Sequence, residues 1–255
     1  MKYSTIAVSH TAPIAEIRLN RPDRGNPIDG QLLDEIDAAV DEIDNDPSVL
    51  AVLLTAEGEV FSHGWEDNAS EFAASAVREN HRLPFRSLEL MGQPVIACVE
   101  GDAIGAGLEL ALACDVRVAA EGVMLAMPDV AVGGMSALGG TQRLPRLVGR
   151  SLAASMILLG EPIDAQRGLT CGLVNDVVPR GEVRPRAIAL AERIAAQGPV
   201  AVRYAKEAMA RGLDMPLEQA LRYETDLTVI LQTTADRAEG VRAFMEKRKP
   251  RFEGR

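Results

Sequence analysis

The stretch Val95-Ile-Ala-Cys-Val-Glu-Gly-Asp-Ala-Ile-Gly-Ala-Gly-Leu-Glu109-Leu decides the fold of this chain. An apolar run rich in β-branched residues, Val95 to Val99, leads into a cluster of three glycines, and an Ala/Leu-rich segment from Leu108 to Ala113 follows. This pattern predicts a strand, a tight turn and the start of a helix. Because N–H groups at a helix start can bind a developing negative oxygen, and Glu109 lies just inside this helix, we expect the chemical centre here.

Length and composition limit the class of protein. The chain has 255 residues, of which 47% are hydrophobic, enough to bury the core of one large α/β domain or of a domain with a small appendage. The formal charge of −10 argues against a nucleic-acid surface, which is normally basic. The amino end carries no basic and then apolar signal segment, and no apolar run is long enough to span a bilayer. We therefore expect a globular protein that binds neither nucleic acid nor membrane.

The three cysteines indicate a reducing compartment. Cys98, Cys114 and Cys171 are odd in number, and each lies in apolar sequence. This usage is typical of buried thiols rather than of a disulfide framework. The expected location is the cytoplasm.

The amino-terminal third predicts a β-hairpin followed by a β-α-β unit. Residues 3–9 and 14–20 alternate as strands, residues 21–27 contain two prolines and a glycine and form a turn, and residues 49–55 form a buried strand. Between them we expect a helix with Asp29 as its N-cap, which Asn45-Asp46-Pro47 ends. The helix should cover one face of the strands.

The rest of the chain alternates short strands with helices and ends in helices. Residues 70–78 and 81–91 are poorly defined helical stretches, the second interrupted by Pro84, as is common in lids. We expect strands at 115–119, 123–125 and 172–179, and helices at 141–148, 151–159, 184–197, 199–211, 217–231 and 235–249. The loop from Pro128 to Gly140 resembles a third strand-turn-helix unit. The sequence thus predicts an α/β core with a helical tail.

A dinucleotide fingerprint is a poor match for the glycine-rich turn. Gly105-Ala-Gly107 fits the first two glycines of G-x-G-x-x-G, but Leu110 occupies the third position, where close helix packing favours Gly or Ala. A Walker-type phosphate loop is excluded because no G-K-[ST] occurs in the chain.

Glu109 and Asp129 are the candidate catalytic carboxylates. Carboxylates on adjacent loops can share one water, one taking its proton while the other donates or orients, which suits the addition of water to a polarised double bond. The alternative is that Glu109 is a solvated helix residue and Asp129 a turn residue after Pro128. Spacing alone leaves both interpretations open.

A resemblance to a known family covers nearly the whole chain. The motifs are Leu19-Asn-Arg-Pro22 with the Asn26 turn, Phe61-Ser-His-Gly64, Gly101-Asp-Ala-Ile-Gly-Ala-Gly-Leu-Glu-Leu-Ala-Leu-Ala-Cys-Asp115, Pro128-Asp129, Gly139-Gly-Thr-Gln-Arg-Leu144, Gly172-Leu-Val-Asn175, Gly198-Pro-Val-Ala201, Ala205-Lys-Glu207, Glu239-Gly240 and Phe244-Met-Glu-Lys-Arg-Lys-Pro250. In this order and spacing, the chain resembles the enoyl-CoA hydratase/isomerase (crotonase) superfamily. The resemblance implies an α/β, crotonase-like fold, a repeated β-β-α spiral with a helical carboxyl-terminal region. It further implies a core over residues 1–195, a trimerisation and lid region over 196–255, and assembly as a homotrimer or homohexamer.

The same resemblance implies the site and the reaction, reversible hydration of a trans-2-enoyl-CoA. The backbone N–H groups of Trp65 and Ala106 are expected to hold the thioester oxygen, with Glu109 activating water and Asp129 protonating the α-carbon. The residues expected to contact substrate or coenzyme A are Gly64, Trp65, Glu66, Asp67, Asn68, Gly105 and Lys247. No metal and no cofactor is expected, since coenzyme A is part of the substrate. The alternatives are isomerisation, thioester hydrolysis or decarboxylation of an acyl-CoA, and a non-catalytic acyl-CoA-binding subunit.

Three residues depart from the family pattern. Asp129 is one methylene shorter than the family's Glu, and Ala106 replaces a glycine, which requires that Ala106 avoid positive φ. Trp65 replaces a usually small residue, and its indole narrows the acyl pocket, stacks on an aromatic or unsaturated acyl group, or packs under the lid.

Three other features also have two interpretations each. His63 is either an acid/base group or a packed or solvent-facing side chain. Met135, with Met124 and Met127, either lines an acyl channel or fills the core. The basic run from Lys247 to Arg251 either reaches coenzyme A phosphates or is a solvated tail.

Overall fold

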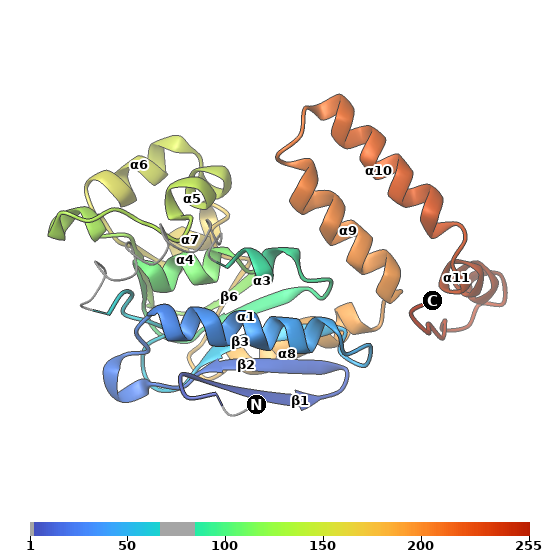
Figure 1. Cartoon of the computed structure of the whole chain (residues 1–255), viewed down its shortest axis with the longest axis horizontal. Helices are drawn as coiled ribbons and strands as arrows, with labels where there is room; N and C mark the ends of the chain where they lie inside the picture. The colour runs from blue at the N-terminus through green and yellow to red at the C-terminus, as the bar shows by residue number, and fades with distance from the viewer. Residues whose placement is uncertain (1–2, 67–84) are drawn as a thin grey trace.

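A six-stranded sheet forms the centre of the protein, seen in a computed structural model that describes residues 3–66 and 85–255. The strand order is β1-β2-β3-β4-β6-β9, with β1 antiparallel to β2 and the other neighbours parallel (Figure 1). The strands are β1 (Ile6–Thr11), β2 (Ile14–Leu19), β3 (Ala51–Ala56), β4 (Val95–Val99), β6 (Val116–Ala120) and β9 (Asp176–Val178). All five residues of β4 are buried, as expected for an apolar strand in the middle of a parallel sheet.

Helices cover the sheet. Helix α1 (Gly30–Asp44) contacts β1 and β2, and α8 (Val183–Ala195) contacts β2, β3, β4, β6 and β9. Helix α1 begins where Asp29 accepts a hydrogen bond from the Leu32 N–H at 2.8 Å, which confirms the predicted N-cap. The buried side chains of α1 recur at helical spacing, so its apolar stripe faces the core.

A second, three-stranded sheet positions the glycine-rich turn. Its order is β5-β7-β8, formed by β5 (Ala103–Ile104), β7 (Met124–Ala126) and β8 (Ile163–Asp164). The short strand β5 joins β4 to helix α4 (Ala106–Leu112), and Ala103 also forms an isolated bridge with Ser62. The start of α4 is therefore held in place by β5, which is bridged to the segment around Ser62.

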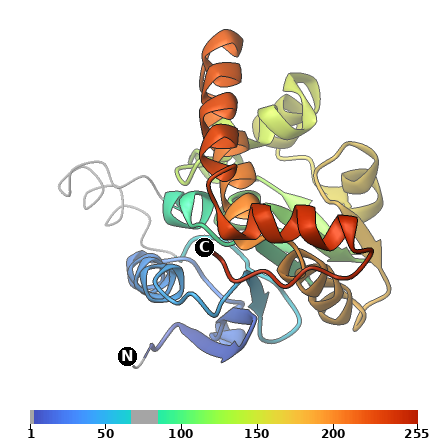
Figure 2. The ribbon, with the colours of Figure 1, turned by 90° about the vertical axis from the view of Figure 1, so that its right-hand side faces the viewer.

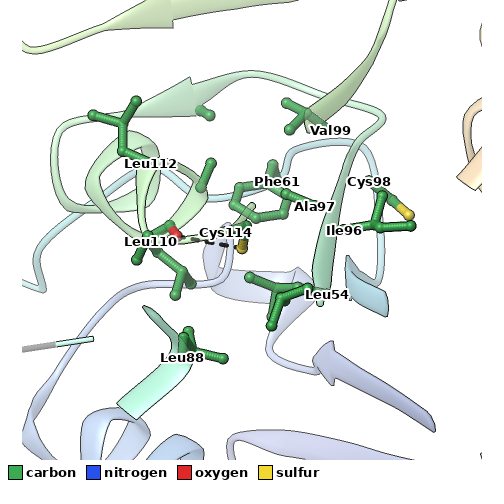
Figure 3. Packing of buried hydrophobic residues seen from close by; sticks show 14 of the residues in the cluster. Leu54, Phe61, Leu88, Ile96, Ala97, Cys98, Val99, Leu110, Leu112 and Cys114 are labelled. Atoms are coloured by element: carbon green, nitrogen blue, oxygen red, sulfur yellow. Dashed lines mark hydrogen bonds between the residues drawn. The ribbon is translucent and has the colours of Figure 1, made fainter. Parts of the chain in front are cut away.

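The core is continuous between the sheet and α4. Figure 3 shows Phe61, Ile96 and Leu110 packed together with neighbouring apolar side chains, and all three are buried. The Cys114 thiol contacts the Leu110 carbonyl at 3.7 Å. Cys98 and Cys114 are buried free thiols as predicted, and burial raises the pKa of both, to about 12 for Cys114. Cys171, however, is only half-buried, so the prediction was wrong for this residue.

The carboxyl-terminal helices extend from the core. Helices α9 (Pro199–Gly212) and α10 (Leu217–Leu231) pack against each other, and α11 (Ala235–Met245) lies beyond them at the end away from α5 and α6 (Figures 1 and 2). Lys206 of α9 joins this region to the core, because its buried Nζ atom lies 2.7 Å from the Asp115 carboxylate.

Most predicted elements form within a few residues of their expected bounds. The remaining helices are η1 (Pro22–Arg24), α3 (Arg86–Leu90), η2 (Asp129–Val132), α5 (Gly140–Val148), α6 (Arg150–Leu158) and α7 (Ala165–Thr170). The sequence prediction missed β8 and α7, which are short and lie in a polar stretch. Helix α11 ends at Met245 rather than residue 249, because Lys247 takes a left-handed φ of 54°. The helical stretch expected over 70–78 lies outside the described residues, as do residues 81–84 of the stretch expected over 81–91, whose described part forms α3.

Candidate active site

The turn before α4 places a backbone N–H at the helix start. Gly105 has φ 51° and ψ −122°, a conformation that favours glycine, and its N–H donates to the Ala126 carbonyl at 2.8 Å. Ala106 is the first residue of α4 and is absent from the residues with positive φ in the described chain, so alanine is acceptable there. Its N–H has no acceptor within the helix, because the first N–H groups of a helix never do.

The segment around Gly64 lies directly beside this N–H. Gly64 has φ 96°, and a Cβ atom there would lie 3.4 Å from the Ala106 nitrogen and 2.8 Å from the Ile104 oxygen. The Ser62 hydroxyl accepts from the Gly64 N–H at 3.1 Å and donates to the Asn26 carbonyl at 2.7 Å. These bonds hold the Gly64–Trp65 backbone against the start of α4.

Glu109 is a fully buried residue, and the two oxygens of its carboxylate have different hydrogen-bond partners. Its Oε1 atom accepts hydrogen bonds from the N–H groups of Leu138, at 2.8 Å, and Gly140, at 2.7 Å. The buried Oε2 atom has no hydrogen-bond partner within residues 3–66 and 85–255. A buried acceptor without a donor is costly and uncommon, so this oxygen is available to bind a water or a substrate group.

The surroundings of Glu109 raise its pKa. Burial, and after it the negative charge of Asp129, outweigh the two N–H donors and the guanidinium of Arg143, and the pKa of Glu109 rises to about 7. A carboxyl group with a pKa near neutral can both accept and release a proton, as general acid–base catalysis requires.

Asp129 lies close to Gly105, the residue before α4. It is half-buried at the beginning of η2, and its Oδ1 atom lies 3.4 Å from the position of a Cβ atom at Gly105. The Ser136 hydroxyl donates to Oδ2 at 3.4 Å. Glu109 follows Gly105 by one helical turn, with its N–H bonded to the Gly105 carbonyl. The two candidate carboxylates therefore flank the first turn of α4.

Trp65 and Glu66, which follow Gly64, contact other parts of the chain. Trp65 is half-buried and forms a parallel bridge with Ile28. Glu66 forms ion pairs with Arg24 and, at 3.9 Å, with Arg21. The carboxylate expected to contact coenzyme A is thus bound by two cations of this chain.

His63 and Met135 both have exposed side chains. His63 is exposed, and its ring covers Gly25, where a Cβ atom would lie 2.0 Å from it. This is the packed, solvent-facing interpretation of His63. The Met135 side chain is 69% exposed, whereas Met127 is buried with its sulfur 3.7 Å from the Ser136 hydroxyl.

One expected contact with coenzyme A, Lys247, is not brought to the site in this chain. Lys247 follows α11, and Figure 1 shows α11 at the opposite end of the molecule from α5 and α6. Asp67 and Asn68 lie outside the described residues.

The sequence interpretation missed the donors to Glu109. Leu138 and Gly140 precede or begin α5, and the glycine pair Gly139-Gly140 marked this turn. The argument that a helix start binds a negative group applies to α5 as it does to α4. The missing step was to connect the α5 start with Glu109, which lies 31 residues before Gly140.

No group of three or more His, Cys, Asp or Glu side chains is arranged to hold a metal ion among the residues that the structure describes. Within the same residues, no helix is long and apolar enough to cross a membrane.

The site combines backbone N–H donors at a helix start with a buried carboxylate of raised pKa and a second acid. This combination is typical of enzymes that bind an oxyanion and transfer protons. The model of the family "Enoyl-CoA hydratase/isomerase" matches residues 9–255. This protein belongs to the enoyl-CoA hydratase/isomerase family, as its sequence motifs predicted.

Individual proteins of this family are similar to the chain over its whole length. It is 37% identical over 254 residues to the 2,3-dehydroadipyl-CoA hydratase of Escherichia coli (strain K12), covering 99% of this chain and 100% of the relative. It is 36% identical to the short-chain-enoyl-CoA hydratase of Clostridium acetobutylicum, covering 98% and 97% of the two chains. The crystal structure of an enoyl-CoA hydratase from Bacillus anthracis, 37% identical, superposes with a TM-score of 0.91 over 99% of this chain and 100% of the other. The crotonase-like α/β fold is thereby confirmed.

Proposed function

We propose that this protein is an enoyl-CoA hydratase, a hydro-lyase that reversibly adds water to a trans-2-enoyl-CoA. Full-length relatives with hydratase names support the activity. The observation that carries it in this chain is the asymmetry of Glu109, in which two N–H groups hold Oε1 while Oε2 has no donor among the described residues. Such a carboxylate has a fixed orientation and one oxygen available for water.

In the proposed reaction, the start of α4 helps to bind the thioester oxygen of the substrate. The N–H groups of Ala106 and Trp65 donate to the thioester oxygen, which becomes more negative as water attacks the β-carbon. Loss of one such donor in other enzymes costs about 2.7–4 kcal/mol of barrier. Support comes from the position of the Gly64–Trp65 backbone beside the Ala106 nitrogen.

The two carboxylates would divide the proton transfers. Glu109 takes a proton from the attacking water, whose oxygen bonds to the β-carbon, and Asp129 gives a proton to the α-carbon. One water is added in total, and exchange of protons with solvent restores both groups. The influence of Asp129 on the pKa of Glu109 supports treating them as a coupled pair. We propose that the reaction needs no metal or other cofactor.

Incubation of the purified protein with crotonyl-CoA tests the proposal. We expect the absorbance of the conjugated thioester to fall and the product mass to increase by one water. Isomerisation would leave the mass unchanged, and thioester hydrolysis would release free coenzyme A. Decarboxylation is tested with an acyl-CoA that carries a carboxyl group on its α-carbon, from which it would release carbon dioxide. The substrate panel should include 2,3-dehydroadipyl-CoA, aromatic and branched enoyl-CoAs, because relatives of similar identity carry different substrate names.

A pair of glutamine variants locates the chemistry. Glu109→Gln should lower kcat by about 100-fold or more, since general acid–base groups contribute at least that much. Glu121→Gln, in the exposed turn between β6 and β7, is the matched control and should keep wild-type activity. Binding of acyl-CoA without turnover of any substrate in the panel would favour the non-catalytic binding subunit instead.

We also propose that residues 196–255 mediate assembly into a homotrimer or homohexamer around the 1–195 core. Many large apolar side chains of this region are exposed, namely Met209, Leu213, Leu217, Leu221, Val229, Ile230, Val241, Phe244 and Met245. Exposed apolar patches of this kind often mark protein interfaces. Sedimentation velocity should give a trimer or hexamer, and a monomer would contradict this.

The free cysteines support a cytoplasmic location.

A further inference from the structure

Arg143 lies directly beneath the loop that binds Glu109. It belongs to the first turn of α5, and its side chain turns back toward the start of its own helix, where Nη1 donates to the Leu138 carbonyl at 2.5 Å. The guanidinium covers Gly139 so closely that a Cβ atom there would lie 2.1 Å from Nη1. The loop and the guanidinium therefore have a fixed relative position.

The same loop holds the catalytic carboxylate from its other side. Leu138 donates its N–H to Glu109 and accepts from Arg143 through its carbonyl, and Gly140 supplies the second N–H to Glu109. A Cβ atom at Gly140 would lie 3.0 Å from the Glu109 Cγ, so the loop also contacts the stem of the carboxylate. The loop is thus bound between a carboxylate and a guanidinium, an arrangement in which hydrogen bonds strengthen each other.

A second carboxylate fixes Arg143. Its Nε atom lies 2.5 Å from Glu89 Oε1 on α3, and Glu89 Oε2 accepts from Arg86 at 2.9 Å. The side chains of Arg143 and Glu89 are only 15% and 20% exposed. Burial works to raise the pKa of Glu89, but the hydrogen bonds and charges of Arg143 and Arg86 outweigh it and lower the pKa. The pair is therefore ionised, and charge-assisted hydrogen bonds of this kind are strong.

We propose that Arg143 is a positioning residue of the hydratase, which acts on Glu109 through the Leu138–Gly140 backbone and is itself anchored by Glu89. This inference rests on the proposed hydration. Arg143 acts in two ways: it keeps the two N–H donors aimed at Glu109 Oε1, which orients Oε2, and its positive charge favours the ionised form of Glu109.

The charges around Glu109 determine in which direction its pKa shifts when Arg143 is removed. Asp129 is the charged group that works with burial to raise the pKa of Glu109, whereas Arg143, with the Leu138 and Gly140 N–H groups, lowers it. Removing Arg143 should raise the pKa of Glu109 further. A smaller fraction of the enzyme would then carry the ionised base at neutral pH.

The test compares Arg143→Met and Arg143→Lys with Arg146→Met as the matched control. Arg146 is exposed one turn away on the same helix and donates to the Gln142 carbonyl. For each protein, kcat and KM for crotonyl-CoA are measured from pH 5 to 9. Amide hydrogen exchange of the Leu138–Gly140 segment is measured without substrate.

Arg143→Met should lower kcat by about 10- to 100-fold, because small displacements of a catalytic group cost that much, while KM changes by less than about threefold. The acidic limb of its pH profile should move to higher pH, and the Leu138–Gly140 amides should exchange faster. Arg143→Lys should recover part of kcat, because an ammonium keeps the charge and one donor. Arg146→Met should match the wild type in all three measurements.

An active wild type with an unchanged kcat, pH profile and amide exchange in Arg143→Met would overturn the inference. An inactive wild type would instead contradict the proposed hydration, and the exchange measurement would still decide whether Arg143 holds the loop. If Arg143→Met does not fold, Arg143→Gln decides: it keeps a polar side chain but removes the positive charge, and an unchanged kcat, pH profile and exchange rate there would equally reject the positioning role.

Discussion

The Oε1 atom of Glu109 lies 2.7 Å from the backbone nitrogen of Gly140, the first residue of α5. A carboxylate from one helix is thus bound at the start of another, where N–H groups and the helix dipole favour negative charge. Burial nevertheless raises the pKa of Glu109 to about 7. The site therefore combines a fixed orientation with a proton affinity near neutral pH, and the pH dependence of the protein should reflect it.

Activity should rise with pH through the pKa of Glu109. The proposed base works only when ionised, so kcat/KM for hydration should increase about tenfold per pH unit below pH 7. The measurement is the initial rate with crotonyl-CoA at low substrate concentration from pH 5 to 9. A profile that is flat down to pH 5 would contradict the assignment of Glu109 as the base.

Stability should have the opposite pH dependence. The pKa of Glu109 is 4.5 in the unfolded chain and about 7 in the folded one, so the folded protein binds more protons between these values. The free energy of unfolding should therefore fall as pH rises through this window. Glu109→Gln removes this term, and it should be more stable than the wild type at pH 8 by up to about 3 kcal/mol.

The comparison requires urea unfolding of both proteins at pH 4.5 and pH 8. The advantage of the glutamine variant should nearly vanish at pH 4.5, where Glu109 is largely protonated in the folded state. An equal difference at both pH values would show that Glu109 does not titrate in this range.

Asp129→Asn should affect both the rate and the pH profile. Loss of the acid should lower kcat by about 100-fold. Because the negative charge of Asp129 raises the pKa of Glu109, the acidic limb of the remaining activity should move to lower pH. Ser136→Ala removes the hydroxyl that bonds Asp129 at 3.4 Å and contacts the Met127 sulfur at 3.7 Å, and it should leave most of the activity. A limb that stays at the same pH in Asp129→Asn would argue against coupling.

Gly105→Ala should damage the site through the backbone. Its φ of 51° with ψ of −122° is strained for alanine, and the new Cβ atom would contact the Asp129 carboxylate at 3.4 Å. We expect a loss of about 1–3 kcal/mol in stability together with a loss of activity. Gly122→Ala has φ of 78° but open space around its Cβ position, so it should lose stability and keep activity. Thermal unfolding and kinetics of both variants separate strain from disruption of the site.

Lys206→Met should loosen α9 from the core. The buried Lys206 Nζ lies 2.7 Å from Asp115 and also donates to the carbonyls of Leu88 and Gln93. Removing one member of a buried ion pair costs about 3–5 kcal/mol, since the other charge stays without its partner. Arg222→Met, which removes an exposed pair with Glu218, should cost less than about 0.5 kcal/mol. Similar midpoints of urea unfolding for the two variants would refute this difference.

The sequence by itself determined the elements whose signals are local. The apolar run of β4, the glycine turn before α4 and the Asp29 cap of α1 each depend on residues close together in the chain, and all three formed as predicted. The candidate carboxylates and the family could also be named, because their motifs recur in a specific order. Short elements in polar sequence, such as β8 and α7, carry no comparable periodicity and were missed.

Only the tertiary structure decided what surrounds the carboxylates. The donors to Glu109 lie 29 and 31 residues away in sequence, and Glu89, which anchors Arg143, lies 54 residues before it. The donors reach Glu109 because α5 packs against α4, and no local pattern specifies that packing. The raised pKa of Glu109 likewise depends on burial and on Asp129, which are properties of the folded chain. Local sequence thus determined which groups can act, and long-range packing determined their orientation and proton affinity.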